Sequence, residues 1–599
     1  MRRAVAWGCA AALILALTAC GFVRWPLPAA TVGDSLNAAF GASPRLHWSA
    51  PQAATFSALP WPSLRVVDAR LNDAYGVNLL SAPTARLDLS LVELMRGRFV
   101  PARAILVSPT VTLDIDRPPF AGAADGSAEP ASVGGALAPL ASLSLSNGVV
   151  RIVSNKRGLD TLIANVRGRL DGLTIGNQLR FDLSAVWRNA PIAILGALGD
   201  PEAAAKGAPS PFAFALDSPI AKFAFSGELA GGDTPSAEGG MTASVSSITA
   251  LTALLNAEAP LALASDDLTI TARVKAALDA IMLGEATVIS AGQTFEGALE
   301  IADPGGRPTV SGTLAADGVA LGPLLGPPER LYDPAGGWSA KPFALAAPPA
   351  FDLDLRLSAS RLDVYGRALS DAAASIIVKD GRLSANLIEA AAYDGRLNGE
   401  ASVEWDGQDL RIRARAELAD ADLGAAFADF GRPVATGRGG ARFAVETYGA
   451  SPAAAVADLS GSASLEAADG GIVGVNLEAA LRRSQRRPID VARDMRLGGT
   501  AFDKLGISFA LDHGRARVEG GRMTSRGVGA ELEGLVDLVA QRWDLRLNAV
   551  QTDAAGEESQ NAARLALDID GPWSAPTIRA IGDAGGSPAS GDEATPPSH

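Results

Sequence analysis

The residues that could carry out acid, base or metal chemistry are few in this sequence. Histidine occurs three times, at His47, His513 and His599. A histidine zinc site or a histidine general base would therefore have to draw on distant parts of the chain. His513 falls in a predicted hairpin turn and His599 is the last residue of the sequence, so we expect solvated surface histidines.

Aspartates spaced by two residues are the next candidates. Asp114/Asp116 and Asp352/Asp354 could suggest a calcium site or the carboxylates of a glycosidase. Residues two apart in a strand project from the same face, and here that face is the polar side of an amphipathic strand. We therefore interpret both pairs as solvated charges, which also discourage aggregation between sheet edges.

Two short motifs resemble nucleotide-binding signals. Residues Asp429-Phe430-Gly431 spell the metal-binding tripeptide of kinases, but the other kinase motifs do not accompany them, and we predict a short helix that ends on the glycine. Gly437, Gly439 and Gly440 lack the strand-to-helix setting of a dinucleotide fingerprint and are predicted to lie in turns. The sequence thus predicts no catalytic residue, no cofactor and no metal site, and the protein is not expected to be an enzyme.

The two cysteines, Cys9 and Cys20, both lie in the first apolar segment. The rest of the chain can therefore form neither a disulfide nor a thiolate metal site. The run Leu17-Thr18-Ala19-Cys20 is similar to a bacterial lipobox, in which Cys20 would be acylated after cleavage. Cys20 is thus a candidate lipidation site.

The same apolar segment is long enough to cross a membrane. Residues 4–23 contain no charge, and at about 1.5 Å per residue they match the roughly 30 Å hydrocarbon thickness of a bilayer. Arg2 and Arg3 would keep the amino end in the cytoplasm, and Trp25 would lie at the far interface. A retained transmembrane helix, a cleaved signal peptide and a lipoprotein signal remain the alternatives. A retained or acylated segment would hold the body outside the cytoplasm, attached to a membrane.

Strands with one apolar side occupy most of the remaining sequence. In residues 395–418, apolar and polar residues alternate on both sides of the turn formers 406–409, which predicts a β-hairpin with one apolar face. Similar alternation recurs along the chain, and helical patterns are few and short. The alternating segments include 85–91, 111–116, 351–357, 507–511 and 565–569, and the helical ones are 91–96, 248–255, 423–430 and 477–483.

Composition agrees with many short strands. The 599 residues include 64 Gly and 37 Pro, and only 5% are aromatic, so large aromatic cores are not expected. The net charge of −14 weighs against a nucleic-acid partner, which requires a basic surface. Segments 122–135 and 582–599 are rich in small and turn-forming residues and are predicted to be a long loop and a disordered tail. Weaker breaks at 199–211 and 231–240 are predicted to be loops between strands.

Blocks of sequence near the two ends of the chain carry a family resemblance. The early blocks are 59–66 (LPWPSLRV), 79–99 (LLSAPTARLDLSLVELMRGRF) and 109–118 (PTVTLDIDRP); the late blocks are 459–477 (LSGSASLEAADGGIVGVNL), 500–505 with the hairpin that follows it to Leu538, and 571–576 (GPWSAP). In this order they resemble the amino-terminal and carboxy-terminal regions of AsmA-family proteins. The lipobox is a departure, because AsmA relatives resemble inner-membrane proteins with a retained anchor.

The resemblance implies a bridge-like lipid-transfer protein of the bacterial envelope. Its expected fold is mainly β: an N-terminal transmembrane helix, then a long curved antiparallel sheet that forms an elongated hydrophobic groove, with few short helices. Its expected partners are phospholipids, the inner membrane and an outer-membrane or periplasmic protein at the distal end. The expected division is an anchor at 1–24, an AsmA-like N-terminal region at 25–120, a flexible loop at 121–136, a β-groove region at 137–440, an AsmA-like C-terminal region at 441–580 and a tail at 581–599.

A curled sheet would place the apolar residues of each strand against a bound acyl chain. We predict a lipid groove lined by Leu87, Leu89, Leu113, Ile115, Leu353, Leu355, Leu397, Val403, Trp405, Leu410, Ile412, Leu418, Phe509 and Leu511. The same side chains could instead fill a closed sandwich or barrel. Abundant alanine and glycine on the apolar side favours the open groove, because small residues fill a core poorly.

Three classes of function follow from these alternatives. A periplasmic lipid carrier that supports outer-membrane biogenesis should show one uninterrupted apolar face and bind phospholipid. A scaffold or regulator of outer-membrane protein assembly should show dry interior packing and a surface for a partner. A polysaccharide-cleaving enzyme would need clustered carboxylates or a cation site, which the sequence does not indicate.

Overall fold

The computed structural model describes residues 21–581, with gaps. By its internal contacts the chain divides into two units, one formed by residues 1–259 and 265–309, the other by 260–264 and 310–599. The division falls inside the predicted β-groove region. Within residues 21–581 the undescribed positions are 41–45, 74–77, 115–139, 155–158, 174–177, 233, 256–265, 304–306, 326–329, 334–335, 344–350, 408, 432, 485–497 and 554–561.

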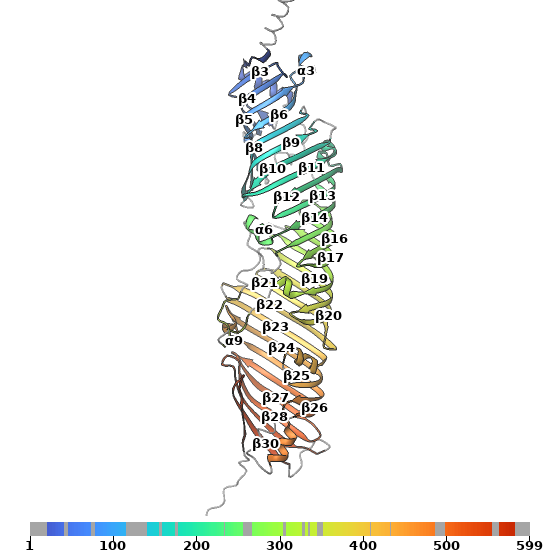
Figure 1. The fold of residues 1–599 in the computed structure, drawn as a ribbon, viewed down its shortest axis with the longest axis vertical. Coiled ribbons are helices and arrows are strands. Elements are labelled where there is room, and N and C mark those ends of the chain that lie inside the picture. Colours follow the sequence, from blue (N-terminus) through green and yellow to red (C-terminus); the bar gives the residue numbers. More distant parts are fainter. Residues whose placement is uncertain are drawn as a thin grey trace, which may run out of the picture. The chain divides into compact units, whose positions relative to one another are not determined.

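The first unit is a sheet of strands that lie side by side as slanted rungs (Figure 1). From β8 onwards each strand pairs antiparallel with the next in chain order. The strands are β1 (Trp25–Leu27), β2 (Leu46–Trp48), β3 (Ala53–Ser57), β4 (Ser63–Asp73), β5 (Asn78–Leu89), β6 (Pro101–Val107), β7 (Thr110–Asp114), β8 (Ser142–Ser154), β9 (Leu159–Asp171), β10 (Leu179–Trp187), β11 (Ala190–Leu198), β12 (Ser210–Asp217), β13 (Ala221–Ala230), β14 (Ser236–Val245), β15 (Leu268–Ala276), β16 (Ala280–Ser290) and β17 (Gln293–Ala302).

The second unit repeats this arrangement. β18 (Thr309–Ala320) begins at the division between the units, and from β19 to β31 each strand pairs antiparallel with the next. The other strands are β19 (Asp352–Val364), β20 (Arg367–Lys379), β21 (Arg382–Ala392), β22 (Gly395–Asp406), β23 (Asp409–Asp422), β24 (Ala435–Gly449), β25 (Ser460–Val473), β26 (Gly499–Asp512), β27 (Arg515–Thr524), β28 (Val528–Asp537), β29 (Arg542–Gln551), β30 (Arg564–Pro572) and β31 (Thr577–Ile581).

The mainly β prediction is confirmed, with one qualification about strand direction. β8 pairs parallel with β6 and with β7, whereas the other pairings found among the described residues are antiparallel. The predicted hairpin is also confirmed: β22 and β23 pair with Val403 opposite Ile412 and Leu397 opposite Leu418. Gly407, in the turn between them, has a positive φ of 66°, which favours glycine.

The helices of the described residues are short and lie in the connections between strands. The four predicted helices are confirmed as α3 (Leu91–Met95), α6 (Ile248–Leu255), α8 (Leu423–Asp429) and α10 (Leu477–Ser484). As predicted, Gly431 follows α8, with a positive φ of 71°. Four more were not predicted: α2 (Ala29–Ala39), α5 (Pro201–Ala205), α7 (Leu321–Leu325) and α9 (Pro452–Asp458).

Two predictions about turns are wrong. Gly437, Gly439 and Gly440 lie inside β24, not in turns. A Cβ on Gly439 would lie 1.9 Å from the carbonyl oxygen of Glu466 on β25, so the close approach of the two backbones excludes a side chain there. The predicted loop 231–240 is also too long, because β14 already begins at Ser236. The break at 199–211 is a connection as predicted, and it contains α5.

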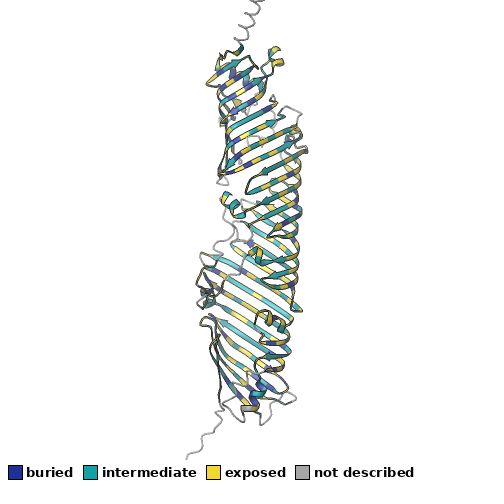
Figure 2. Cartoon of the chain, viewed as in Figure 1, coloured by how far each residue is buried: buried dark blue, intermediate teal, exposed yellow. Residues whose placement is uncertain are grey.

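Two buried clusters close parts of the apolar surface (Figure 2). In the first unit, Val32 and Leu36 of α2 pack on buried residues of β3, β4, β5 and β6, including Leu64 and Leu87. In the second unit, α10 packs with β26, β27, β28, β29 and β30 around Leu567. A helix laid on the apolar side of a sheet removes that side from water.

Candidate functional site

Hydrogen-bonded register aligns apolar residues across the second unit from β19 to β30. Each residue of the row below lies opposite the next, so one apolar line crosses every strand of this span. We call the side of the sheet that carries this row the apolar face, and the opposite side the polar face. The row is Leu355, Ile376, Ala385, Ala401, Ala414, Val445, Gly461, Leu511, Ala516, Val536, Trp543 and Gly571.

The first unit has a row of the same kind. It runs from β1 to β17, by way of β6 and β8 where the pairing is parallel. Every member is apolar or glycine: Leu27, Ala54, Val66, Ala85, Leu106, Leu145, Gly168, Leu183, Ile194, Leu216, Phe223, Ala243, Ile270, Val288 and Phe295. Strands alternate their side chains between faces, so each row marks one side of the sheet along the strands that it crosses.

The predicted lining residues fall into two environments. Most of those on β19, β22 and β23 are half-buried on the apolar face: Leu353, Leu355, Leu397, Val403, Trp405, Ile412 and Leu418, whereas Leu410 is buried. Leu397 and Leu418 pack against a buried cluster of Leu369, Ala372, Ala390 and Ala392. The predicted lining residues near the ends of the chain are also largely in contact with protein. Leu87 and Leu89 are buried, and Phe509 and Leu511 pack against a buried cluster of Ala516, Val536 and Leu545. Leu113 is exposed, and Ile115 lies outside the described residues.

At the carboxy-terminal end of the second unit, α10 fills the apolar face. Leu477, Ala480 and Leu481 are at most 2% exposed and share one cluster with Leu505 and Leu567. α10 contacts β26 and also the neighbouring strands β29 and β30, which are separated from β26 by β27 and β28. The apolar face of these strands therefore curves around the helix.

A segment between β18 and β19 covers the other ends of the same strands. Trp338 donates its indole N–H to the carbonyl oxygen of Leu538 at 2.7 Å, and its ring meets Trp573 edge-on. The backbone N–H of Phe343 donates to Ala450 O. We call residues 336–343 the rim segment, because they fasten the turns at one end of β24 to β30.

The polar face carries ion pairs that run from strand to strand. In the middle of the second unit, Arg382, Glu404, Arg413 and Glu446 follow one another across β21, β22, β23 and β24, with N···O distances of 3.1 to 3.5 Å. The hydrogen bond from Arg413 lowers the pKa of Glu446. These side chains are between 35% and 49% exposed. Because solvent screens such pairs, they help to fix the cross-strand register and add little stability.

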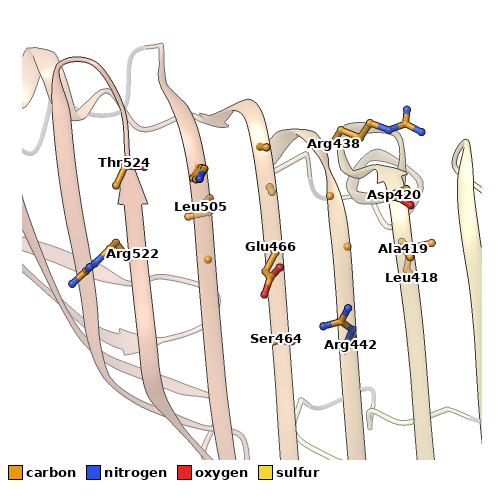
Figure 3. A pocket seen from close by; sticks show the side chains of 16 residues that line it. Leu418, Ala419, Asp420, Arg438, Arg442, Ser464, Glu466, Leu505, Arg522 and Thr524 are labelled. Atoms are coloured by element: carbon orange, nitrogen blue, oxygen red, sulfur yellow. The ribbon is translucent and has the colours of Figure 1, made fainter. Parts of the chain in front are cut away.

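A hollow of about 660 Å³ lies over β23 to β27, and its charged lining belongs to the polar face (Figure 3). Two of its arginines form ion pairs with neighbouring strands. Arg442 binds Glu417 at 2.8 Å and Arg522 binds Glu531 at 2.7 Å. These two ion pairs extend the cross-strand pattern of the polar face into the hollow.

One titratable group stands out by its surroundings. Burial, and then a hydrogen bond to Asp429 at 2.7 Å, raise the pKa of Tyr393 to about 12. Arg367 lies near the same carboxylate and over the ring of Phe430. This cluster joins the turn between β21 and β22 to the end of α8 and so has a structural role. Within the described residues, no group of three or more His, Cys, Asp or Glu is placed to hold a metal ion.

The sequence analysis missed an aromatic part of the apolar face in the first unit. On β12, Phe212 and Phe214 pack against Phe225 and Phe223 of β13, with ring centroids 6.0 and 5.9 Å apart. The signal was present, because these phenylalanines alternate with small or polar residues in 210–217 and 221–227. They belong to the same face as the predicted lining residues of their unit.

The predictions for the amino-terminal segment fall almost entirely outside the described residues, which begin at Gly21. They concern the transmembrane helix at 4–23 and the lipidation of Cys20. No helix in the described part of the chain has both the length and the apolar character needed to span a membrane. The predicted loop at 122–135 and the tail at 582–599 are likewise undescribed.

Comparison with known proteins gives one family. Residues 335–520 match the model of the AsmA family, a range that includes the sequence blocks 459–477 and 500–505 but not the blocks near the start of the chain or 571–576. No curated protein matches the chain. The chain therefore carries an AsmA family domain over residues 335–520.

Proposed function

We propose that this protein carries phospholipid along its apolar face, as a membrane-attached protein of the bacterial periplasm that supports outer-membrane biogenesis and lipid homeostasis. The observation that carries the proposal is the uninterrupted row of apolar residues across β19 to β30. The AsmA family domain supports an envelope location. No step of this function requires a catalytic group, and we propose that the protein is not an enzyme.

The size of the hydrophobic effect explains why a continuous apolar surface would matter. A phospholipid with two acyl chains exposes some thirty CH₂ groups to water, at about 0.8 kcal/mol each, so free passage costs on the order of 20 kcal/mol. Side chains that replace membrane hydrocarbon along the path would remove most of this cost. A break in the row by a charged residue would restore part of it.

The half-buried residues of β19, β22 and β23 are the best candidates to contact acyl chains. Val403 and Ile412 lie opposite each other on neighbouring strands, and both are half-buried. Closed packing would leave them inaccessible, and full exposure to water would be unfavourable for an apolar face of this extent. Bound acyl chains would bury the part of these side chains that the protein leaves exposed.

The test is the lipid content of the full chain purified in mild detergent, measured by mass spectrometry. We expect phospholipid with the natural sequence, and loss of most of it with the double variant Val403→Asp and Ile412→Asp. The matched control is Ala444→Asp with Ser462→Asp. These two residues also face each other on neighbouring strands, but they are exposed on the polar face.

The outcomes separate the two main functions. Lipid loss in the apolar-face variant alone, with circular dichroism unchanged, supports carriage along this face. A folded apolar-face variant that keeps its lipid, or equal loss in both variants, contradicts it. If the natural protein binds no phospholipid at all, a scaffold for outer-membrane protein assembly becomes the better explanation.

A further inference from the structure

One end of the first unit exposes a group of large apolar side chains. Trp61, in the turn between β3 and β4, is 66% exposed, and Met95 at the end of α3 is 74% exposed. Trp25 on β1 is 50% exposed. Monomeric soluble proteins rarely gather such groups without a partner. The set comprises Phe22, Val23, Trp25, Trp61, Leu91, Val92 and Met95, and we call it the apolar end surface.

Backbone hydrogen bonds bring these residues to the same strand ends. The carbonyl oxygen of Gly21 accepts the N–H groups of Ala58 and Leu59, at 3.2 and 2.8 Å. The N–H of Leu89, just before α3, donates to Pro62 O at 2.8 Å. The start of the described chain, the β3–β4 turn and α3 are thus neighbours, and Figure 1 shows α3 and β3 at the same end of the unit.

The short helix α3 presents its apolar side outward. Its acid, Glu93, is held by Arg96 at 2.8 Å and by Arg98 at 2.6 Å. Leu91, Val92 and Met95 make none of these polar contacts and are exposed. A one-sided element of this kind, with arginine beside apolar residues, suits the boundary between lipid headgroups and acyl chains.

The sequence favours a membrane as the partner of the apolar end surface. The uncharged run 4–23 ends where Gly21 is fixed to the β3–β4 turn. If that run lies in a bilayer, the apolar end surface must meet the surface of the same bilayer. Tryptophan is enriched at this depth, and Trp25 and Trp61 both lie here.

We infer that the apolar end surface is a membrane-contact site that rests in the headgroup region of a phospholipid bilayer. The inference depends on the proposed membrane attachment and is independent of lipid carriage along the apolar face. The contact would orient the sheet of this unit on the membrane, where a single anchor would leave it free to tilt.

Photo-crosslinking in vesicles tests the contact. The full chain is reconstituted into vesicles of phosphatidylethanolamine and phosphatidylglycerol, with p-benzoylphenylalanine in place of Met95 or of Trp61. The control position is Leu278, which is 75% exposed in the turn between β15 and β16 of the same unit. We expect lipid adducts from positions 95 and 61, and almost none from 278.

The remaining outcomes overturn the inference in distinguishable ways. Equal lipid adducts at 95 and 278, in protein that floats with the vesicles, would show that attachment holds without this contact. If the protein does not float with the vesicles, the proposed membrane attachment is wrong. Crosslinks from position 95 to a protein in whole cells, without lipid adducts in vesicles, would assign the surface to a protein partner. None of these results bears on the lipid content of the Val403 and Ile412 variant.

Discussion

Two regions of the second unit share one strand pattern but differ in what covers their apolar face. In β19 to β23, which we call the open region, the row residues Leu355, Ile376 and Ala414 are half-buried and Ala401 is exposed. In β26 to β31, the closed region, Met523, Val528, Ala530, Ala549, Leu565 and Leu567 are buried beneath α10. Alternation alone therefore does not decide whether an apolar face is open or filled.

The connections between strands make the difference. The open region is joined by tight turns, such as Tyr365-Gly366 and Asp380-Gly381, whose residues have positive φ values of 51° to 89°. Turns of this length hold no side chain that could reach back over the sheet. The connection from β25 to β26 is long enough to contain α10. A face closes where one long connection returns an apolar helix to it.

Matched leucine substitutions test whether the apolar face is packed more tightly in the closed region than in the open region. Leu567 is 0% exposed in the closed region, so Leu567→Ala should lower the free energy of unfolding by about 2–5 kcal/mol. Leu355 is half-buried in the open region, and Leu355→Ala should cost about 1 kcal/mol. Denaturant titrations of the two variants measure the difference. Equal losses would mean that the open region is packed as tightly as the closed one.

Substitutions that enlarge a side chain test the same difference in packing between the closed and open regions. Ala549, in the closed region, is 3% exposed, and Ala549→Phe should cost about 1–3 kcal/mol by overpacking. Ala414 lies between Ala401 and Val445 in the open region, and Ala414→Phe should leave the unfolding midpoint almost unchanged. The same Ala414 variant should reduce bound phospholipid, because the added ring occupies the face. A destabilised Ala414 variant would indicate a filled interior there.

The rim segment offers a sharper test of how the closed region is held. Trp338→Phe keeps an aromatic ring but removes the hydrogen bond to Leu538 O, which should cost about 1 kcal/mol. Hydrogen exchange should then speed up at the N–H of Leu538, which donates to Gly514 O, and not in the open region. Tyr332→Phe is the control, because its ring still stacks on Trp338. Unchanged exchange in the Trp338 variant would mean that the rim segment does not secure these turns.

Alternation and turn residues were enough to predict the strands of the open region. The hairpin of β22 and β23 follows directly from its sequence, since the apolar period fixes which residues share a face. The helices α3, α6, α8 and α10 were also predictable from short helical patterns. The identity of the lining residues on β19, β22 and β23 comes from the same signal, although their contact with lipid stays a prediction.

Long-range packing could not be predicted in this way. The pattern of α10 gives a helix but not the strands it covers, and the weak apolar pattern of α2, with Gly33 in its middle, gave no helix. A bulge between Ser508 and Phe509 changes which residues of β27 join the apolar face, and a bulge is set by the pairing of two strands. The glycines of β24 were wrongly predicted to lie in turns. They are required by the close approach of the β25 backbone, which the sequence of β24 alone does not reveal.

The smallest expected effect concerns the point where the open region meets α8. The hydroxyl of Tyr393 donates to Asp429, and the pKa of Tyr393 is raised to about 12 in the folded protein, against about 10 for an unfolded tyrosine. The fold therefore favours the neutral phenol. Its contribution to stability is complete below about pH 10 and is lost as the pH rises from about 10 to about 12.

The variant Tyr393→Phe should remove this dependence, and the effect should be small because the side chain is only half-buried. Unfolding midpoints of the natural protein and the variant, compared between pH 9 and pH 12, isolate the contribution, since all other titrating groups are common to both. The difference between the two proteins should shrink with rising pH. A constant difference would mean that the hydroxyl does not hold α8 against the turn of β21 and β22, and that α8 is fixed by Leu423 in the buried cluster of the closed region.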